Sequence, residues 1–328
     1  MKSSAQTPDH IWFNGGMVRW EDAKVHVLTH AFNYGTAAFE GLRAYPAGDE
    51  MYIFRLQDHI RRLFESAKIY GIRVGYSQEE LADACVDVVA RNKLHVRAYI
   101  RPLAYVANIG IGISFANQPA GVAIAAVPFE DYFAHKDGIS VGISSWRRIS
   151  EQSLPPAAKI SGHYTNSVLG KMEALANGFG EAIMLDMSGK VSEGTGENIF
   201  VAKDGRLVTP PKGGGILEGI TRRTIIELAA EEGIEVVERG LARTELYGCD
   251  EAFFVGTAAE VTPITSIDRK TVSDGKPGRI TKTMMGLYSK AVVGELSGHR
   301  GWVTPVYARR AGVQQTASRK PSHAPGLT

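Results

Sequence analysis

The irregular order of strand-like and helix-like segments constrains the fold of this chain more than any other sequence feature. Apolar runs predict an N-terminal hairpin, with strands at 11–13 and 17–18 around the turn Asn14-Gly15-Gly16. Further strands are predicted at 51–54, 96–106, 121–127, 139–145, 182–186, 198–202, 207–209, 234–237, 252–255 and 261–267. Helical spacing of apolar residues predicts helices at 56–67, 77–88, 166–177, 220–232 and 280–296. Because these segments do not alternate regularly as βαβ units, the sequence favours an α+β fold over a doubly wound sheet.

Local signals also predict boundaries along the chain. Ser77 and Glu80 have the spacing of a capping box, so we expect a helix to begin just after Ser77. Pro155-Pro156 interrupts the pattern and by itself suggests a domain boundary. Residues 313–328 are mostly polar or small, which predicts a disordered tail. A chain of 328 residues is long enough for two domains.

Composition argues against several classes of function. The 37 Lys and Arg balance 35 Asp and Glu, so the chain lacks the basic excess of a dedicated nucleic-acid or membrane-surface binder. Cys85 and Cys249 do not have disulfide-scaffold or zinc spacing, and we expect no metal site. No apolar stretch approaches the ~18 residues of a membrane helix, and residues 1–9 lack the apolar stretch of a signal peptide. A cytoplasmic protein is therefore expected.

One lysine stands in a setting that suits covalent catalysis. Lys159 lies among small and apolar residues, and Tyr164 follows five positions later. Desolvation favours the neutral amine, which is the nucleophile in Schiff-base chemistry. On this segment alone, an ordinary surface lysine beside a loop is the more common interpretation.

Three glycine-containing segments follow in the second half of the chain. The first, 191–200, places Glu193 before two glycines and ahead of a strand. The second, 213–221, leads through Gly219 and Thr221 into a helix, where free N–H groups and the helix dipole favour an anion. The third, 256–260, puts small residues after a strand. Each segment alone could be a structural turn or a simple helix cap.

Taken together and in this order, these segments resemble the fold-type IV pyridoxal-phosphate enzymes, and most closely the branched-chain amino-acid aminotransferases. The resemblance extends to 34–43, to 62–70 and to 98–102 in the first half, and it covers about residues 10–305. It implies a two-domain α+β enzyme with its active site between the domains. It also moves the expected domain boundary from Pro155-Pro156 to about residue 128. The implied units are a small domain at 1–128, a loop at 129–138, a larger cofactor-binding domain at 139–312, and the tail.

The resemblance implies pyridoxal 5'-phosphate as cofactor. Lys159 would form the Schiff base with it and then move the proton to and from the substrate Cα. Glu193 would keep the pyridine nitrogen protonated, and Tyr164 would bind the phenolic oxygen of the ring. The family pattern assigns the phosphate to Arg62, Ile220, Thr221 and Thr257, the ring face to Leu217, the start of the phosphate helix to Gly219, and a close backbone approach to Gly196.

The resemblance also implies a pocket that accepts both branched side chains and the glutamate side chain. Arg101 would bind the side-chain carboxylate of glutamate, and Tyr99, two residues away, points to the same side of its strand. The α-carboxylate would be held by Tyr99 and the amides of Thr257 and Ala258, supported by Arg43 and the neighbouring Gly41. The apolar wall would contain Tyr34, Phe39, Phe129, Tyr132 and, from a neighbouring subunit, Ile111 and Ile113. Because relatives often carry tryptophan at position 129, the fine side-chain preference stays open.

The expected activity is transamination of L-leucine, L-isoleucine and L-valine with 2-oxoglutarate, by a homodimer or homohexamer. A D-amino-acid aminotransferase or (R)-selective amine transaminase is the alternative within the fold; aminodeoxychorismate lyase fits the two pocket arginines less well. A non-catalytic binding protein on this scaffold would lack Lys159 or Glu193, and both are present. The sequence leaves the preferred amino acid, the oligomeric state and the metabolic direction undecided.

Overall fold

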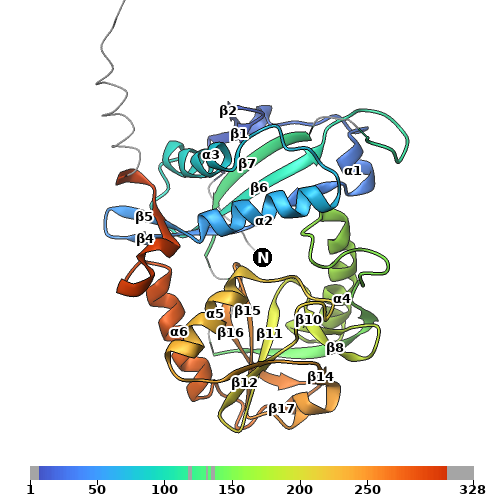
Figure 1. The fold of residues 1–328 in the computed structure, drawn as a ribbon, viewed down its shortest axis with the longest axis vertical. Helices are drawn as coiled ribbons and strands as arrows, with labels where there is room; N and C mark the ends of the chain where they lie inside the picture. Colours follow the sequence, from blue (N-terminus) through green and yellow to red (C-terminus); the bar gives the residue numbers. More distant parts are fainter. Residues whose placement is uncertain (1–6, 117–119, 131, 134–136, 309–328) are drawn as a thin grey trace, which may run out of the picture.

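The computed structural model describes residues 7–116, 120–130, 132–133 and 137–308. The predicted tail at 313–328 lies outside these residues. The described chain forms two sheets, one above the other in Figure 1, and each sheet has its own helices.

The first sheet is antiparallel throughout. Its strands are β1 (His10–Phe13), β2 (Gly16–Arg19), β3 (Ala37–Phe39), β4 (Leu42–Ala47), β5 (Glu50–Phe54), β6 (Ala98–Val106), β7 (Ala120–Pro128) and β18 (Val303–Pro305). They pair in the order β18-β5-β4-β6-β7-β1-β2, and β3 pairs with β6. Helices α2 (Leu56–Ile69) and α3 (Gln78–Arg91) pack on this sheet, and short helices α1 (His30–Tyr34) and η1 (Trp20–Asp22) lie in its connections.

The second sheet is mixed. Its strands are β8 (Ile139–Arg147), β9 (Glu181–Leu185), β10 (Lys190–Gly194), β11 (Asn198–Lys203), β12 (Arg206–Thr209), β13 (Val236–Glu238), β14 (Leu241–Ala242), β15 (Glu251–Gly256), β16 (Glu260–Ile267) and β17 (Lys270–Thr271). The order is β13-β12-β11-β15-β16-β8-β9-β10-β14, with β17 beside β16. Strand β8 runs parallel to β9 and β16, and the other pairs are antiparallel except β12 with β13.

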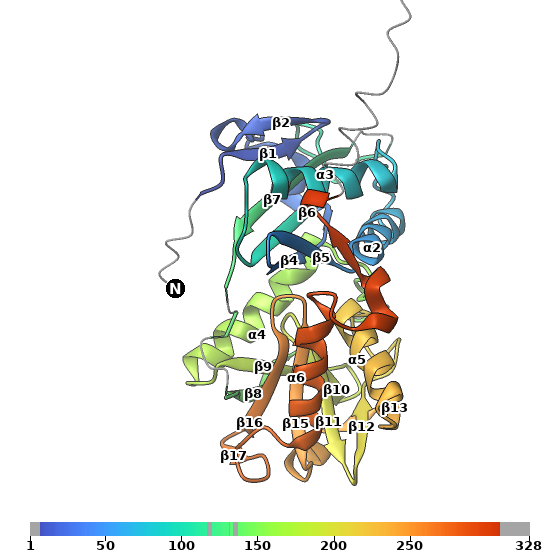
Figure 2. The ribbon, with the colours of Figure 1, turned by 90° about the vertical axis from the view of Figure 1, so that its left-hand side faces the viewer.

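Helices pack around the second sheet, as Figure 2 shows for α6 in front of β15 and β16. They are η2 (Ser161–His163), α4 (Tyr164–Ala176), α5 (Ile220–Glu231), η3 (Arg243–Tyr247), α6 (Arg279–Ala291) and η4 (Ser297–Trp302). Aromatic residues of the first sheet also belong to the hydrophobic core between the second sheet and its helices α5 and α6. The Phe54 ring, for example, lies 5.5 Å from the Tyr288 ring of α6. The two units therefore share a packed core and are joined by more than the connecting chain.

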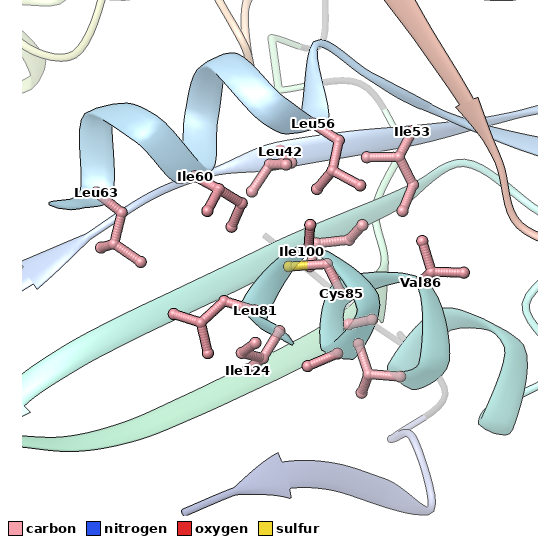
Figure 3. Packing of buried hydrophobic residues seen from close by; sticks show 14 of the residues in the cluster. Leu42, Ile53, Leu56, Ile60, Leu63, Leu81, Cys85, Val86, Ile100 and Ile124 are labelled. Atoms are coloured by element: carbon pink, nitrogen blue, oxygen red, sulfur yellow. The ribbon is translucent and has the colours of Figure 1, made fainter. Parts of the chain in front are cut away.

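The main core of the first unit follows from the spacing of apolar residues on α2. Leu56, Ile60 and Leu63 recur at intervals of four and three, so they share one helix face, and all are buried. Figure 3 shows this face meeting side chains of α3 and of the sheet strands.

The predicted α+β fold is confirmed, and so are the local signals that rest on backbone chemistry. Asn14 and Gly15 both have positive φ, at 48° and 101°, as a tight hairpin turn requires. The capping box forms as expected: Glu80 N–H donates to Ser77 Oγ at 3.1 Å, and Ser77 N–H donates to Glu80 Oε2 at 2.7 Å.

Several element predictions were wrong in detail. Strand β10 was missed because its buried residues include Ser192 and Glu193, which break the apolar pattern. Helix α6 ends at Ala291 and not at 296, because the chain turns soon afterwards at Gly294, with φ of 75°. The short elements α1, β3 and β4 also had no predicted counterpart.

Sheet membership departs from the predicted 139–312 unit at its C-terminal end. Strand β18 returns to the first sheet and pairs with β5, with Thr304 opposite Ile53. Arg55 N–H extends this contact by donating to the Trp302 carbonyl at 2.6 Å. The reason is physical: β5 is otherwise an edge strand with unpaired backbone groups, and β18 satisfies them.

Among the described residues, no helix combines the length and apolar character needed to cross a membrane.

The α2 face predicts a position-dependent loss of stability. We expect Ile60→Ala to lower the free energy of unfolding by about 2–5 kcal/mol, because it opens a cavity in a closed core. Ile69→Ala is the matched control on the same helix, since Ile69 is 52% exposed whereas Ile60 is 0% exposed. Urea unfolding followed by circular dichroism measures both variants. Equal losses would contradict the described packing.

Candidate active site

Lys159 lies where the two sheets meet. Its carbonyl accepts the Phe39 N–H at 3.0 Å, next to the bridge between Ala38 and Ile160, and its own N–H donates to Ser66 Oγ at 3.0 Å. The segment that carries the lysine is thus fixed to β3 and α2 of the first unit. The Lys159 Nζ donates to the Tyr164 hydroxyl at the start of α4, a contact that was not predicted.

Glu193 is buried beneath this lysine, at the end of β10, and is 4% exposed. Its Oε1 accepts Arg148 Nε at 2.8 Å, and its Oε2 accepts Asn198 Nδ2 at 3.0 Å and the Leu217 N–H at 3.1 Å. Burial raises the pKa of this carboxyl group, and the Arg148 charge opposes that rise. The carboxylate is therefore held in one orientation by donors from three segments.

The N-terminus of α5 offers an anion site. Gly219 is its N-cap residue, and no side chain caps the first turn. A Cβ at Gly219 would lie 1.9 Å from Asn198 Oδ1, so only glycine lets the helix begin this close to the asparagine that holds Glu193. Ile220 and Thr221 follow, and the unpaired N–H groups of a first turn attract anions. This cradle fits the phosphate of the cofactor that the sequence implies.

Arg62 is held beside the cradle by a buried carboxylate. Its Nε and Nη2 donate to Oε1 and Oε2 of Glu40 at 2.6 and 2.9 Å, and its Nη1 donates to the Glu218 carbonyl at 2.8 Å. Although burial opposes it, Arg62 and His59 hold the pKa of Glu40 well below its usual range. Arg62 was expected to act by its charge, but the partner that fixes this charge, Glu40 inside the quoted 34–43 motif, was not predicted.

These groups line one cavity of about 190 Å³. The predicted site residues that line it are Phe39, Gly41, Arg62, Tyr99, Arg101, Tyr132, Lys159, Tyr164, Glu193, Gly196, Leu217, Gly219, Ile220, Thr221, Thr257 and Ala258. The cavity also contains Gly256, which opens the quoted 256–260 segment, and residues to which no role was assigned, namely Arg148, Thr195, Glu197, Asn198 and Val255.

The pocket end away from α5 carries the predicted arginine. Arg101 Nη2 donates to the Tyr99 hydroxyl at 3.0 Å, so the two side chains lie on one side of β6 as expected. The Arg101 guanidinium also lies 4.7 Å from the centre of the Phe39 ring. Gly41 is needed here, because a Cβ would lie 1.8 Å from the Tyr99 hydroxyl oxygen. A cation therefore stands next to an aromatic wall.

Arg43 and Phe129 do not line this cavity. The Arg43 guanidinium is 1% exposed and donates to Glu260 Oε1 at 2.9 Å and to the carbonyls of Phe129 and Glu130. Arg43 also lines an adjacent cavity of about 400 Å³ that shares Tyr132 and Ala258 with the first. Its contact with the Ala258 carbonyl, at 3.4 Å, makes it a support for that segment. Its charge is already satisfied by protein groups.

Tyr34, Ile111 and Ile113 also lie outside the cavity. The Tyr34 hydroxyl accepts the Gly112 N–H at 3.1 Å, which ties this tyrosine to the loop between β6 and β7. Ile111 and Ile113 are 90% and 82% exposed. Their expected contribution through a neighbouring subunit stays a prediction.

Arg148 and Asn198 are the clearest omissions of the sequence analysis. Asn198 stands in the quoted 191–200 segment, but only the turn between β10 and β11 brings its amide back to Glu193. Arg148 is 45 residues from Glu193 in sequence and directly follows the end of β8. A buried carboxylate needs a compensating cation, which is the signal that could have prompted a search for such a partner.

Comparison with known proteins fits this arrangement. The Amino-transferase class IV family matches residues 37–267. The branched-chain-amino-acid aminotransferase of Escherichia coli (strain K12) is 47% identical over 305 residues, which cover 91% of this chain and 97% of that protein.

Solved structures are equally similar. The branched-chain aminotransferase of Thermoproteus uzoniensis, solved with norvaline, superposes with a TM-score of 0.89 at 46% identity and covers 92% of this chain and 100% of that one. The T.th. branched-chain amino acid aminotransferase complexed with N-(5'-phosphopyridoxyl)-L-glutamate has a TM-score of 0.87 at 41% identity, with coverages of 90% and 98%. The chain therefore belongs to the class IV aminotransferases and, among them, to the branched-chain-amino-acid aminotransferase family.

Proposed function

We propose that this enzyme binds pyridoxal 5'-phosphate and transfers the amino group of L-leucine, L-isoleucine or L-valine to 2-oxoglutarate, forming L-glutamate and the branched 2-oxo acids. The observation that carries the proposal is the convergence of the Lys159 amine, the anchored Glu193 carboxylate and the uncapped start of α5 in one cavity. This cofactor needs three attachment points: a basic amine, a carboxylate that pairs with the pyridinium nitrogen, and a cradle for the phosphate. The related structure with a phosphopyridoxyl-glutamate ligand supports the same assignment.

The cradle would hold the phosphate with the first-turn N–H groups of Ile220 and Thr221, with Thr257, and with the charge of Arg62. The phosphate would share the Arg62 guanidinium with Glu40, because two of the Arg62 nitrogens donate hydrogen bonds to the Glu40 carboxylate. That ion pair also fixes the guanidinium before a ligand arrives, so little conformational entropy is lost on binding. Leu217 and Gly196 border the same space.

When bound, pyridoxal phosphate supplies an electron sink that makes the substrate Cα–H acidic. Glu193 stabilises a positive charge at the pyridine nitrogen, and Arg148 and Asn198 keep its carboxylate in place. Lys159 Nζ would take the proton from the substrate Cα and pass it to a carbon of the cofactor, and in the other half-reaction it would move a proton in the reverse direction. Tyr164, which accepts a hydrogen bond from Lys159 Nζ, orients that amine.

Substrate selection rests on the opposite end of the cavity. Phe39 and Tyr132 offer an apolar wall for a branched side chain. Arg101 is partnered only by the neutral Tyr99 hydroxyl among the described residues, so its charge can bind the second carboxylate of glutamate. The α-carboxylate would be held by Tyr99 and the Thr257 and Ala258 amides, and Arg43 supports Ala258 from behind.

We further propose a cytoplasmic homo-oligomer. The described cysteines, Cys85 and Cys249, are free and buried, as is typical of reducing compartments. The exposed Ile111 and Ile113, on the loop tied to Tyr34, would contact a second copy and extend the apolar wall.

A substrate panel tests the reaction. With 2-oxoglutarate as acceptor, the purified holoenzyme should form L-glutamate from L-leucine, L-isoleucine and L-valine, measured by chiral chromatography. D-amino acids and (R)-amines should react much more slowly, because they present the carboxylate on the other side of the pocket or lack it. Faster turnover of either class would refute the assigned substrate.

Removal of the lysine tests the catalytic assignment. Lys159→Ala should abolish transamination, because no other group at the site moves the Cα proton. Borohydride should fix the cofactor to the wild-type chain, as a mass increase on the peptide that contains Lys159, and should leave the variant unlabelled. Lys282→Ala changes an exposed lysine and is the control. Substantial turnover by the Lys159 variant with a native circular dichroism spectrum would disprove the role.

Substitution of Arg101 should affect the acceptor that has a second carboxylate and spare the branched acceptor. We expect Arg101→Gln to raise KM for 2-oxoglutarate at least about tenfold, or ~1.4 kcal/mol, while KM for 4-methyl-2-oxopentanoate changes little. Steady-state kinetics of the two acceptors measures this, with Arg91→Gln on the surface of α3 as control. An equal rise for both acceptors would place Arg101 at a carboxylate that they share.

A further inference from the structure

Glu197 is a buried carboxyl group in the wall of the active-site cavity, and none of the roles proposed above uses it. It stands at the turn between β10 and β11 and is 4% exposed. Its Oε2 accepts the Gly196 N–H at 3.0 Å. Among the described residues, no donor reaches Oε1 and no cation forms an ion pair with the group. The Glu197 carboxyl group in the cavity wall can therefore form a further hydrogen bond through Oε1.

The nearby cations are already engaged. On α4, Lys171 Nζ donates to Glu181 Oε2 at 2.7 Å and to the Gly180 carbonyl at 2.6 Å. Glu181, on β9, is fully buried and also accepts the Thr195 hydroxyl at 2.7 Å. Arg148 is engaged in the same way by Glu193 on β10. Two cations thus neutralise two carboxylates, and Glu197 is a third acid without a counter-ion.

Charge balance at this position favours a proton on Glu197. Burial and the neighbouring Glu181 carboxylate raise the pKa of Glu197 to about 8, against the opposing effects of the Gly196 N–H and Lys171, and Glu193 adds to the rise. Tyr132 lines the same cavity, and burial together with Glu197 and Glu181 raises the pKa of its hydroxyl, so it adds no charge at neutral pH.

Glu197 lies next to the segment that is proposed to bind the substrate α-carboxylate. Its Cγ would lie 3.7 Å from a Cβ built on Gly256, and the Gly196 carbonyl would lie 3.5 Å from the same atom. Glu197 therefore lies beside Gly256, and it lines the same cavity as Thr257 and Ala258, whose amides are the proposed α-carboxylate site. An ionised carboxylate here would repel that ligand, whereas a neutral carboxylic acid is a hydrogen-bond donor to it.

We propose that Glu197 acts as a neutral carboxylic acid that donates a hydrogen bond to the substrate α-carboxylate, so that carboxylate binding depends on this residue keeping its proton. The inference rests on the proposed function for the identity of the ligand. It assigns Glu197 a specificity role for carboxylate-bearing substrates, distinct from that of Arg101, which serves only the second carboxylate of glutamate.

Binding of 4-methylpentanoate, an unreactive carboxylate that does not titrate between pH 6.5 and 9.5, tests the proposal on the holoenzyme. Calorimetry should give a wild-type Kd that is constant below about pH 8 and at least about tenfold weaker at pH 9.5, because the competent form loses its proton. Glu197→Gln, which keeps a neutral donor, should match the wild type at pH 7 and lose this alkaline weakening. Glu197→Leu, which has no donor, should bind about tenfold more weakly at every pH. The exposed Glu232→Gln is the control and should follow the wild type.

Infrared spectroscopy reads the proton without any ligand. At pH 7 the wild type and Glu232→Gln should show the carbonyl stretch of a protonated carboxyl group, and Glu197→Gln should lack it. An unchanged band in Glu197→Gln, the same alkaline weakening in Glu197→Gln, or wild-type affinity in Glu197→Leu would each overturn the proposal. If the infrared band behaves as expected but the substrate panel gives no transamination, the proposed function fails and the protonation of Glu197 stands.

Discussion

The burial of the Glu193 carboxylate is the constraint on which the site depends. An ion in a protein interior is tolerated only when charge and hydrogen bonds replace the water that it loses, and a lost partner costs about 3–5 kcal/mol. Here the partners are Arg148 after β8, Asn198 at the start of β11 and Leu217 ahead of α5. One carboxylate thus fixes the mutual positions of a strand end, a turn and the segment that leads into the anion-binding helix.

The first unit supplies a second buried carboxylate that works in the same way. Glu40 links Arg62 and His59 of α2 to the strand segment before β4. The Lys159 segment is attached to the same region through Phe39 and Ser66. The groups proposed to hold the cofactor therefore come from both units, and each is oriented by contacts within the protein. Such preorganisation is the main source of catalytic advantage in polar sites.

Sequence reasoning succeeded where chemistry is local and failed where it depends on pairing. The Ser77 cap and the Asn14-Gly15 turn were predictable because each needs only a few neighbouring residues. Lys159, Glu193 and Gly219 were found through a motif order that resembles a known family, and the cavity brings them together. Strand β10 was missed because it buries polar residues, and the roles of Arg148 and Glu40 were missed because their partners lie 45 and 22 residues away. Arg43 was expected to support the α-carboxylate site, but its burial against Glu260 could not be read from its motif.

The return of β18 to the first sheet has a mechanical consequence. The chain passes between the two sheets twice, once between β7 and β8 and once between α6 and β18. A body attached at one point can swing in any direction, whereas a body attached at two can turn only about the line that joins them. The contacts across the seam, such as the hydrogen bond from the Phe39 N–H to the Lys159 carbonyl, oppose rotation about that one line, so the two sides of the site are held in register.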